Sequence, residues 1–597
     1  MSAKNTPPPD LIELWTAMAR GFGRMQAAIA DHVERNARGN GFTIPDPGVV
    51  GDTFAEAWLR LLADPERLAA AQGDLLRRQS ELWQMALKRL AGEPAEPVAQ
   101  PTRGDKRFAD EAWSKEAAFD VIKQAYLLTA DWLQTTLHGV EGLTPHTRHK
   151  VDFFARLAVD ALAPSNFLLT NPKALRTTIE TGGRNLIDGL KNFVADLERG
   201  HGALSISMTD YDAFEIGGNV ATSPGKVVFQ NELMQLIQYS PATKTVFKRP
   251  LLIVPPWINK FYILDLRAQN SFVKWCTDQG LTVFMVSWVN PDASLSHKGF
   301  DDYMLEGPLA ALDAIAAATG EKSVNIIGYC IGGTLTAGTL AYMAAKKDRR
   351  IASATYFVAL TDFRDAGDLK VFIDEQQLAL LDAHMAERGF LEGRHMANVF
   401  NLMRDNDLIW SFVVNNYLLG REPFPFDLLY WNSDSTRMPA MMHSFYLRKM
   451  YLENKLVEPG GIALAGVPID LRRIRVPSFL VSTREDHIAP WKATYAATQI
   501  YRGPVRFVLA ASGHIAGVVN PPGSAKYSYW TNPDLPPDPE TWLAGAKEHP
   551  GSWWPEWLSW LKPHAGARVP ARTPGDGALA PIEDAPGSYV KVRLADA

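Results

Sequence analysis

Apolar residues in the first hundred positions recur at the three- and four-residue spacing of amphipathic helices. One stripe is formed by Leu11, Leu14, Trp15, Met18, Phe22, Met25 and Ile29. A second stripe is formed by Leu75, Gln79, Leu82, Trp83, Ala86 and Leu90. We expect both stripes to pack in a core or between helices, with docking of a partner helix or an apolar particle as the alternative. A segment rich in Pro, Ala and Glu follows between Gly92 and Gly104 and indicates an exposed linker.

From about residue 216 the pattern changes to short apolar runs that alternate with helical periods. Expected strands cover Val227–Gln230, Leu233–Tyr239, Pro250–Pro255, Leu281–Trp288, Val324–Gly328, Thr355–Leu360, Pro477–Ser482 and Val505–Ala510. Expected helices cover about 265–279, 302–318, 332–346 and 490–500. This alternation predicts right-handed βαβ units, and hence an α/β fold with a mostly parallel sheet.

Mainly helical segments precede and interrupt this alternating region. We expect residues 1–104 to be a helical extension with its linker, and residues 105–215 to be a helical N-terminal region. The run from about 363 to 470 is long, helical and rich in aromatic residues. It predicts a helical cap inserted into a catalytic domain that spans residues 216–597.

The composition and net charge argue against several classes of protein. Of the 597 residues 46% are hydrophobic, which excludes a wholly disordered chain. With 61 basic and 66 acidic residues the net charge is −5, which argues against nucleic-acid binding along the whole chain. Two cysteines exclude a disulfide scaffold and fit a reducing cytoplasm. Since the sequence has neither a secretory signal nor an uninterrupted apolar run of about 18 residues, we expect a cytoplasmic protein without a transmembrane segment.

The strongest chemical signal is the run Gly328-Tyr-Cys-Ile-Gly-Gly333, between an apolar run and the small-residue start of an expected helix. This is the nucleophile-elbow pattern of the α/β-hydrolase fold, with cysteine in place of serine. Its glycines let the backbone turn sharply without a Cβ clash, and the helix N-terminus favours a thiolate. We therefore predict that Cys330 is a nucleophile, with a buried structural cysteine beside a packing turn as the alternative.

A cysteine nucleophile needs a base, and this fold supplies first an acid and then a histidine later in the chain. Asp486 follows an expected strand and is the predicted acid, with Glu485 as the weaker alternative. His514 follows the last expected strand in a Gly-His step and is the predicted base. We interpret His487, next to Asp486, as a substrate contact, with a plain structural role as the alternative.

The oxyanion formed in such a reaction needs two backbone N–H donors. One should be Ile331, directly after the nucleophile. The other should come from the loop Pro255–Lys260, where Ile258 is favoured and Asn259 is the alternative. The second cysteine, Cys276, has no elbow around it and is predicted to be a core residue. The sequence contains neither the ligand spacing of a zinc site nor a P-loop, so we expect no metal.

At these residues the chain resembles the polyhydroxyalkanoate synthases. The similar blocks are Pro255–Leu266, Ser287–Pro291, Gly328–Gly333, Arg484–Ile488, Ser512–Ile515 and Ala585–Lys591. The resemblance runs from about residue 105 to the C-terminus, and residues 1–104 match only as a variable helical extension. The single long chain resembles class I of the family. That resemblance implies a short-chain (R)-3-hydroxyacyl-CoA substrate such as 3-hydroxybutyryl-CoA, with CoA as a product and no separate cofactor.

The resemblance also implies roles and partners. Cys330 would carry the growing chain, His514 would deprotonate Cys330, and Asp486 would orient His514 or help to activate the incoming hydroxyl. The active form would be a homodimer on the surface of a nascent polyester granule. Granule-associated proteins would be further partners.

Thioester chemistry gives a reason for a thiol nucleophile. Attack by a thiolate on an acyl-CoA exchanges one thioester for another, and the later transfer to a hydroxyl is downhill. Water would end the chain by hydrolysis, so the cap should exclude it. A thioesterase or polyester depolymerase on the same fold is the alternative function. The intact set of Cys330, Asp486 and His514 argues against an inactive granule-coating protein.

Overall fold

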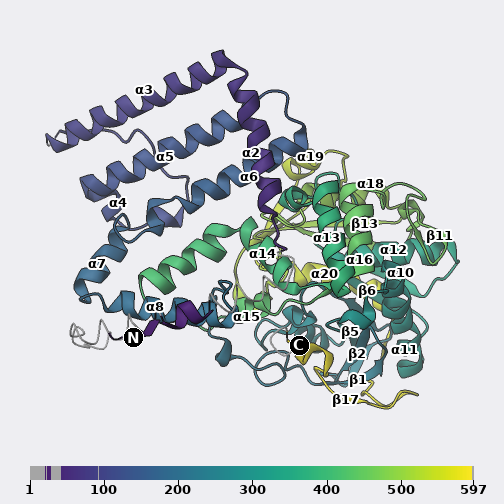
Figure 1. The fold of residues 1–597 in the computed structure, drawn as a ribbon. Helices are drawn as coiled ribbons and strands as arrows, with labels where there is room; N and C mark the ends of the chain where they lie inside the picture. The colour runs from purple at the N-terminus through teal and green to yellow at the C-terminus, as the bar shows by residue number, and fades with distance from the viewer. Residues whose placement is uncertain (1–15, 17–19, 22, 29–41, 92, 594–597) are drawn as a thin grey trace. The chain divides into compact units, whose positions relative to one another are not determined.

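The computed structural model describes residues 16, 20–21, 23–28, 42–91 and 93–593 (Figure 1). Most of the first predicted stripe lies outside these residues and stays a prediction. The chain forms two compact units. A helical unit contains the chain up to Asp210 together with Asn398–Pro425, and an α/β unit contains Tyr211–Ala397 and the chain from Phe426.

The longer helices in the described part of the helical unit are α2 (Pro47–Leu62), α3 (Pro65–Leu90), α5 (Ala117–His138), α6 (Pro145–Ala161), α7 (Pro172–Glu180) and α8 (Arg184–Arg199). Four of these helices start in the same way. Before α2, α3, α6 and α7 stands an Asp, Thr or Asn whose side chain accepts a hydrogen bond from an amide of the first turn. Each of these four helices has proline at its first position, where no partner for an N–H is needed.

Helix α3 packs on α5, and α2 packs on both α3 and α6 (Figure 1). The second predicted stripe is confirmed as a seam at Leu82 and Ala86, which are 7% and 5% exposed. It is wrong at Trp83, which is 66% exposed. Since one residue turns a helix by about 100°, Trp83 cannot share the buried face of Leu82.

The middle of the predicted cap belongs to the helical unit. Two π-helical turns, η8 (Asn406–Trp410) and η9 (Val413–Leu418), follow α14 (Gly393–Met403). Helix α8 lies directly against η9: a Cβ at Gly189 would lie 1.9 Å from the Tyr417 carbonyl oxygen, so only glycine fits there. The Tyr417 hydroxyl also donates to Asp196 at 2.6 Å. The rest of the cap, α13 (Glu375–Arg388), α15 (Asp427–Ser433) and α16 (Ala440–Tyr446), lies in the α/β unit.

The described part of the α/β unit is built on an eleven-stranded sheet. In spatial order its strands are β15 (Lys547–Pro550), β14 (Ser528–Thr531), β13 (Val505–Ala510), β12 (Ser478–Thr483), β7 (Ile351–Phe357), β6 (Val324–Tyr329), β4 (Leu251–Val254), β5 (Val283–Trp288), β2 (Met234–Tyr239), β1 (Gly225–Gln230) and β17 (Glu583–Asp584). The six strands from β13 to β5 pair in parallel. The outer strands pair antiparallel.

All eight expected strands are present, and the sequence pattern missed the short edge strands β14, β15 and β17. These edge strands are only partly buried, so they lack a continuous apolar run. The helix expected over 265–279 is wrong at its start. Helix α9 spans Phe272–Asp278, because the Ser271 side chain caps it by accepting from the Lys274 amide at 2.8 Å.

Three further expected helices are present, two of them divided. The helix expected over 302–318 consists of α10 (Phe300–Met304), a π turn (Leu305–Leu309) and α11 (Ala310–Thr319). Pro308 in that turn has no N–H to donate, which favours the irregularity. The helix expected over 490–500 consists of α17 (Trp491–Tyr495) and α18 (Ala497–Ile500), and the one over 332–346 is α12 (Ile331–Ala345).

Two tryptophans at the start of α20 (Trp554–Ala565) hold the loop after β13. The indole N–H of Trp553 donates to the Gly517 carbonyl, and that of Trp554 donates to the Val518 carbonyl, each at 2.9 Å. Both side chains are buried in the main core of the unit. The loop that carries His514 is therefore fixed by the core, although it lies at the edge of the strands.

Candidate active site

Cys330 lies at the sharp turn between β6 and α12, as the elbow pattern predicted. Its φ of 52° and ψ of −123° are a strained conformation for a residue with a side chain. The glycines are required by close approach: a Cβ at Gly328 would lie 2.5 Å from Gly333, and a Cβ at Gly332 would lie 2.3 Å from the Val254 carbonyl. The turn therefore holds the cysteine at the carboxyl edge of the parallel strands.

Asp486 and His514 meet at the same edge. The His514 Nδ1 lies 2.7 Å from Asp486 Oδ2, and both side chains are almost fully buried. The other oxygen, Asp486 Oδ1, accepts from the amides of Ile488 and Ala489 at 2.9 and 2.8 Å. A carboxylate held in this way fixes the orientation of the imidazole. Glu485, the weaker alternative for the acid, is exposed.

The charges around His514 decide its protonation. Burial lowers the pKa of His514, but the charges of Asp486 and Cys330, together with hydrogen bonds to both, outweigh burial and raise this pKa to about 10. The imidazole therefore holds a proton at neutral pH, between a carboxylate and the Cys330 sulfur. A histidine in this position is able to store the proton that the thiol loses.

The predicted oxyanion donors lie on two segments that touch. Ile331 is the first residue of α12, where an amide has no partner within the helix. Gly332 packs against the Pro255 carbonyl at the start of the loop that carries Ile258 and Asn259. The Ile258 carbonyl accepts from the Thr436 amide at 3.1 Å, and Asn259 forms an isolated β-bridge with Ser435. The geometry brings the loop to the elbow, and the choice between Ile258 and Asn259 stays open.

A buried ion pair holds that loop in place. Lys260 Nζ lies 2.7 Å from Asp434 Oδ1, and both side chains are at most 3% exposed. The Tyr262 hydroxyl donates to the same carboxylate at 2.9 Å. Lys260 Nζ also donates to the Val592 carbonyl at 2.9 Å. The C-terminal segment and the cap thus both fasten the loop that carries the predicted second oxyanion donor.

His487 directly follows Asp486 in the chain and is half-buried. Its contact with substrate stays a prediction.

Cys276 is fully buried in α9, as predicted, and burial raises the pKa of its thiol well above the ordinary value. Among the described residues no group of three or more His, Cys, Asp and Glu is placed to hold a metal ion. No described helix is both long and apolar enough to cross a membrane.

A pair of tyrosines near the cysteine was not predicted from the sequence. Tyr446, at the end of α16, and Tyr451, in the following π turn η10 (Leu447–Leu452), are 6% and 4% exposed. Burial raises the pKa of both phenols, and the charge of Cys330 raises each further. Their rings pack edge to face at 5.4 Å. The only sequence signal was the aromatic composition of the cap, which does not distinguish a residue beside the sulfur from a packing residue.

The fold and this site define the class of protein. A parallel sheet with a nucleophile elbow after β6 and an acid–histidine pair after β12 and β13 is an α/β-hydrolase fold with a cysteine at the nucleophile position. The family described as "alpha/beta hydrolase fold" matches residues 250–521. A putative hydrolase from Agrobacterium vitis S4 is 12% identical in a structural alignment that covers 49% of this chain and 90% of that chain, with a TM-score of 0.30.

Sequence relatives identify the family. The family described as "Poly-beta-hydroxybutyrate polymerase (PhaC) N-terminus" matches residues 104–276. A poly(3-hydroxyalkanoate) polymerase of Methylorubrum extorquens is 53% identical over 540 residues, which cover 90% of this chain and 89% of the relative. The poly(3-hydroxyalkanoate) polymerase subunit PhaC of Cupriavidus necator is 45% identical over 536 residues, 89% of each chain. The chain therefore belongs to the poly(3-hydroxyalkanoate) polymerases, a family of acyltransferases.

Proposed function

We propose that this protein polymerises short-chain (R)-3-hydroxyacyl-CoA, such as 3-hydroxybutyryl-CoA, and releases CoA. The observation that carries the proposal is the Asp486–His514 pair, 2.7 Å long, beside a cysteine on a nucleophile elbow. Family membership supplies the polyester product, and the site supports covalent catalysis by a thiol. No cofactor is needed, because CoA enters as part of the substrate.

The first half-reaction is a thioester exchange. The Cys330 thiol gives its proton to His514, and the resulting thiolate attacks the carbonyl carbon of the acyl-CoA. The amide of Ile331 and one from the Ile258–Asn259 loop stabilise the oxyanion. The C–S bond to CoA breaks, and the leaving sulfur takes the proton from His514. One thioester replaces another, so little of the acyl-transfer potential is lost.

The second half-reaction forms the ester. A 3-hydroxyl group attacks the carbonyl carbon of the Cys330 thioester, the C–S bond breaks, and the hydroxyl proton returns to the Cys330–His514 pair. Asp486 keeps the imidazole oriented or helps to activate the hydroxyl. His487 contacts the substrate.

The cap controls access to this reaction. Tyr446 and Tyr451 are buried and lie near enough to Cys330 for its charge to raise the pKa of their phenols, so the cap would exclude water here. An acyl-enzyme kept dry in this way is transferred to a hydroxyl rather than hydrolysed. The cap must move for CoA and for the growing polyester.

Labelled 3-hydroxybutyryl-CoA tests the proposal. Wild-type protein should release CoA, form insoluble polymer and carry label on Cys330. Cys330→Ala should lose all three, whereas Cys276→Ala, which removes the other cysteine, should keep them. CoA release with only free 3-hydroxybutyrate would favour the thioesterase or depolymerase alternative. Polymer formation by Cys330→Ala would overturn the mechanism.

The assembly proposed with this function is a cytoplasmic homodimer on the surface of a polyester granule, with granule-associated proteins as further partners. Sedimentation of the protein before and after addition of 3-hydroxybutyryl-CoA tests both parts. A dimer that moves into the pellet with newly made polymer is expected. A monomer that stays in the supernatant while polymer pellets would contradict the proposed assembly.

A further inference from the structure

The helical unit contains a cavity of about 850 Å³ that none of the proposed catalytic residues lines. Its walls come from residues 102–110, from the start of α7 and from η8 and η9, which all belong to this unit. A volume of this size lies within the range of about 300–1,000 Å³ that small-molecule pockets cover. The cavity is therefore large enough for a ligand with several functional groups.

The charges at the cavity do not balance. Its lining contains four basic residues and three carboxylates. The paired groups are Arg107 with Asp105 and Asp160, Asp110 with Arg176, and Asp407 with Arg404. The exposed side chains of Arg103, Lys106 and Lys173 form no ion pair with any residue that the structure describes. Because three cations remain, the cavity favours an anion with more than one negative group.

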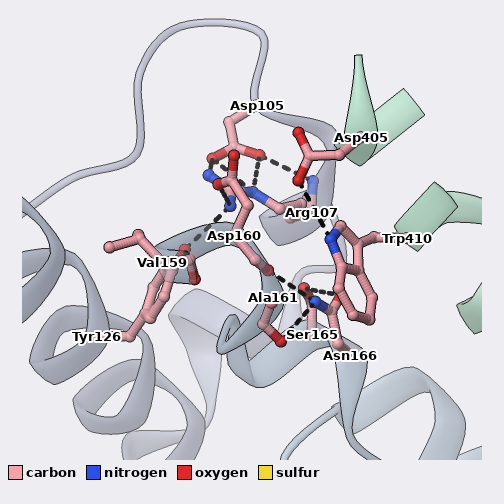
Figure 2. A network of polar contacts seen from close by, with 10 residues as sticks. All are labelled: Asp105, Arg107, Tyr126, Val159, Asp160, Ala161, Ser165, Asn166, Asp405 and Trp410. Atoms are coloured by element: carbon pink, nitrogen blue, oxygen red, sulfur yellow. Dashed lines mark hydrogen bonds and ion pairs between the residues drawn. The ribbon is translucent and has the colours of Figure 1, made fainter. Parts of the chain in front are cut away.

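The indole ring of Trp410 forms part of one wall of the cavity, and a contact within the helical unit holds it in place. Figure 2 shows Trp410 beside Asp405, and its indole N–H donates to Asp405 Oδ2 at 3.2 Å. Asp405 is 2% exposed, so this contact fixes the ring from behind. Trp410 is only partly buried, and no aromatic ring among the described residues packs on it. Its face offers a stacking surface for a planar group.

The same wall carries a hydrogen-bond acceptor that lacks a donor. Asn406 Oδ1 is buried and receives no hydrogen bond from the residues that the structure describes. A buried acceptor of this kind costs free energy until a donor meets it. The exocyclic amino group of adenine is such a donor, and asparagine is the side chain that commonly pairs with the edge of this base.

We propose that this cavity binds an adenine nucleotide with at least two phosphates, the chemistry that CoA, acyl-CoA and ADP share. Arg103, Lys106 and Lys173 would bind the phosphates, Trp410 would stack on the base, and Asn406 would accept from its amino group. A lone phosphate would use neither the indole nor the amide. The site lies within the helical unit and is additional to Cys330, so it does not depend on the polymerase mechanism.

Calorimetric titration of the full-length protein with ADP tests the site. ADP should bind saturably, and its affinity should fall as salt is raised. Inosine diphosphate, which lacks the amino group, should bind about tenfold more weakly, and pyrophosphate more weakly still. Saturable binding of pyrophosphate as tight as that of ADP would show a phosphate site only, and would overturn the proposal.

Two matched double variants decide whether this cavity is the site. Lys106→Ala with Lys173→Ala should weaken ADP binding at least about tenfold, because two phosphate contacts are lost. Lys88→Ala with Arg184→Ala removes two other cations of the same unit that form no ion pair with the described residues, and should leave binding unchanged. Equal affinity in the two double variants, or no saturable ADP binding to the wild type, would overturn the proposal. Titration with CoA distinguishes the two possible ligands of the cavity. Tighter binding of CoA than of ADP would indicate that the ligand is CoA or acyl-CoA, and tighter binding of ADP would indicate a free nucleotide.

Discussion

The elbow after β6 and helix α9 each carry one of the two cysteines, and they give that residue opposite properties. Cys330 is partly exposed, has a φ of 52°, and is one of the groups that raise the pKa of His514. Cys276 is fully buried in regular helix, and burial alone raises the pKa of its thiol. Backbone shape and charged neighbours, rather than residue type, therefore decide which thiol is suited to act as a nucleophile.

After the loss of Cys330 itself, the largest effect should come from the carboxylate that is hydrogen-bonded to His514. Asp486→Asn keeps the shape of the side chain but removes its charge from His514. We expect the rate of CoA release to fall about 10³- to 10⁴-fold, as for other acid–histidine pairs. Steady-state release of CoA from 3-hydroxybutyryl-CoA measures the effect.

The neighbouring carboxylate provides the control. Glu485 is exposed, so Glu485→Gln should change the rate less than twofold. The assignment of the acid would be wrong if Glu485→Gln lost activity and Asp486→Asn kept it. Circular dichroism should show the same helix content in both variants.

His514, a neighbour that Cys330 has and Cys276 lacks, should make the free energy of unfolding depend on pH. The folded protein raises the pKa of His514 from 6.5 to about 10, so protonated His514 stabilises the fold. This contribution is fully present below pH 6.5 and is lost as pH rises through about 10. Its size is on the order of 5 kcal/mol.

Urea unfolding of the wild type and of His514→Gln from pH 6 to pH 10 checks this linkage. The wild type should be the more stable protein at pH 6, and its advantage should shrink toward pH 10. Titrations that the two proteins share cancel in the difference. An advantage that stays constant across this range would contradict a raised pKa for His514.

Much of the site was predictable from sequence because its signals are local. The elbow needs glycines at fixed positions around Cys330, and Asp486 and His514 each follow a strand that its apolar run reveals. Tyr451 was not predictable, because its place beside the sulfur depends on how the cap folds. The transfer of Asn398–Pro425 to the helical unit rests on contacts with helices more than two hundred residues earlier in the chain. Apolar periodicity does not encode such long-range contacts.

The substitution Gly332→Ala should distort the elbow without changing Cys330. The Cβ of Gly332→Ala would lie 2.3 Å from the Val254 carbonyl oxygen, which the backbone relieves only by moving. We expect a loss of about 1–3 kcal/mol in the free energy of unfolding, and a fall in rate of about a hundredfold as the nucleophile shifts. Gly338→Ala lies in the same helix, where the new Cβ meets the tip of the Leu464 side chain at 3.2 Å and Phe300 at 4.0 Å. It should be nearly neutral in both urea unfolding and activity, and equal losses in the two variants would refute a special role for the elbow glycine.

The smallest effect should come from the other cysteine. Cys276→Ala removes a fully buried sulfur from α9 and leaves a small cavity, which should cost about 1 kcal/mol in the free energy of unfolding. Its rate of CoA release should stay within twofold of the wild type, because no charged neighbour couples this thiol to the site. Cys330→Ala should give the reverse pattern, with little change in urea unfolding and no turnover, since its side chain is partly exposed and is the proposed nucleophile. A Cys276→Ala protein that folds normally but fails to release CoA would show that reactivity in this chain is not confined to the elbow.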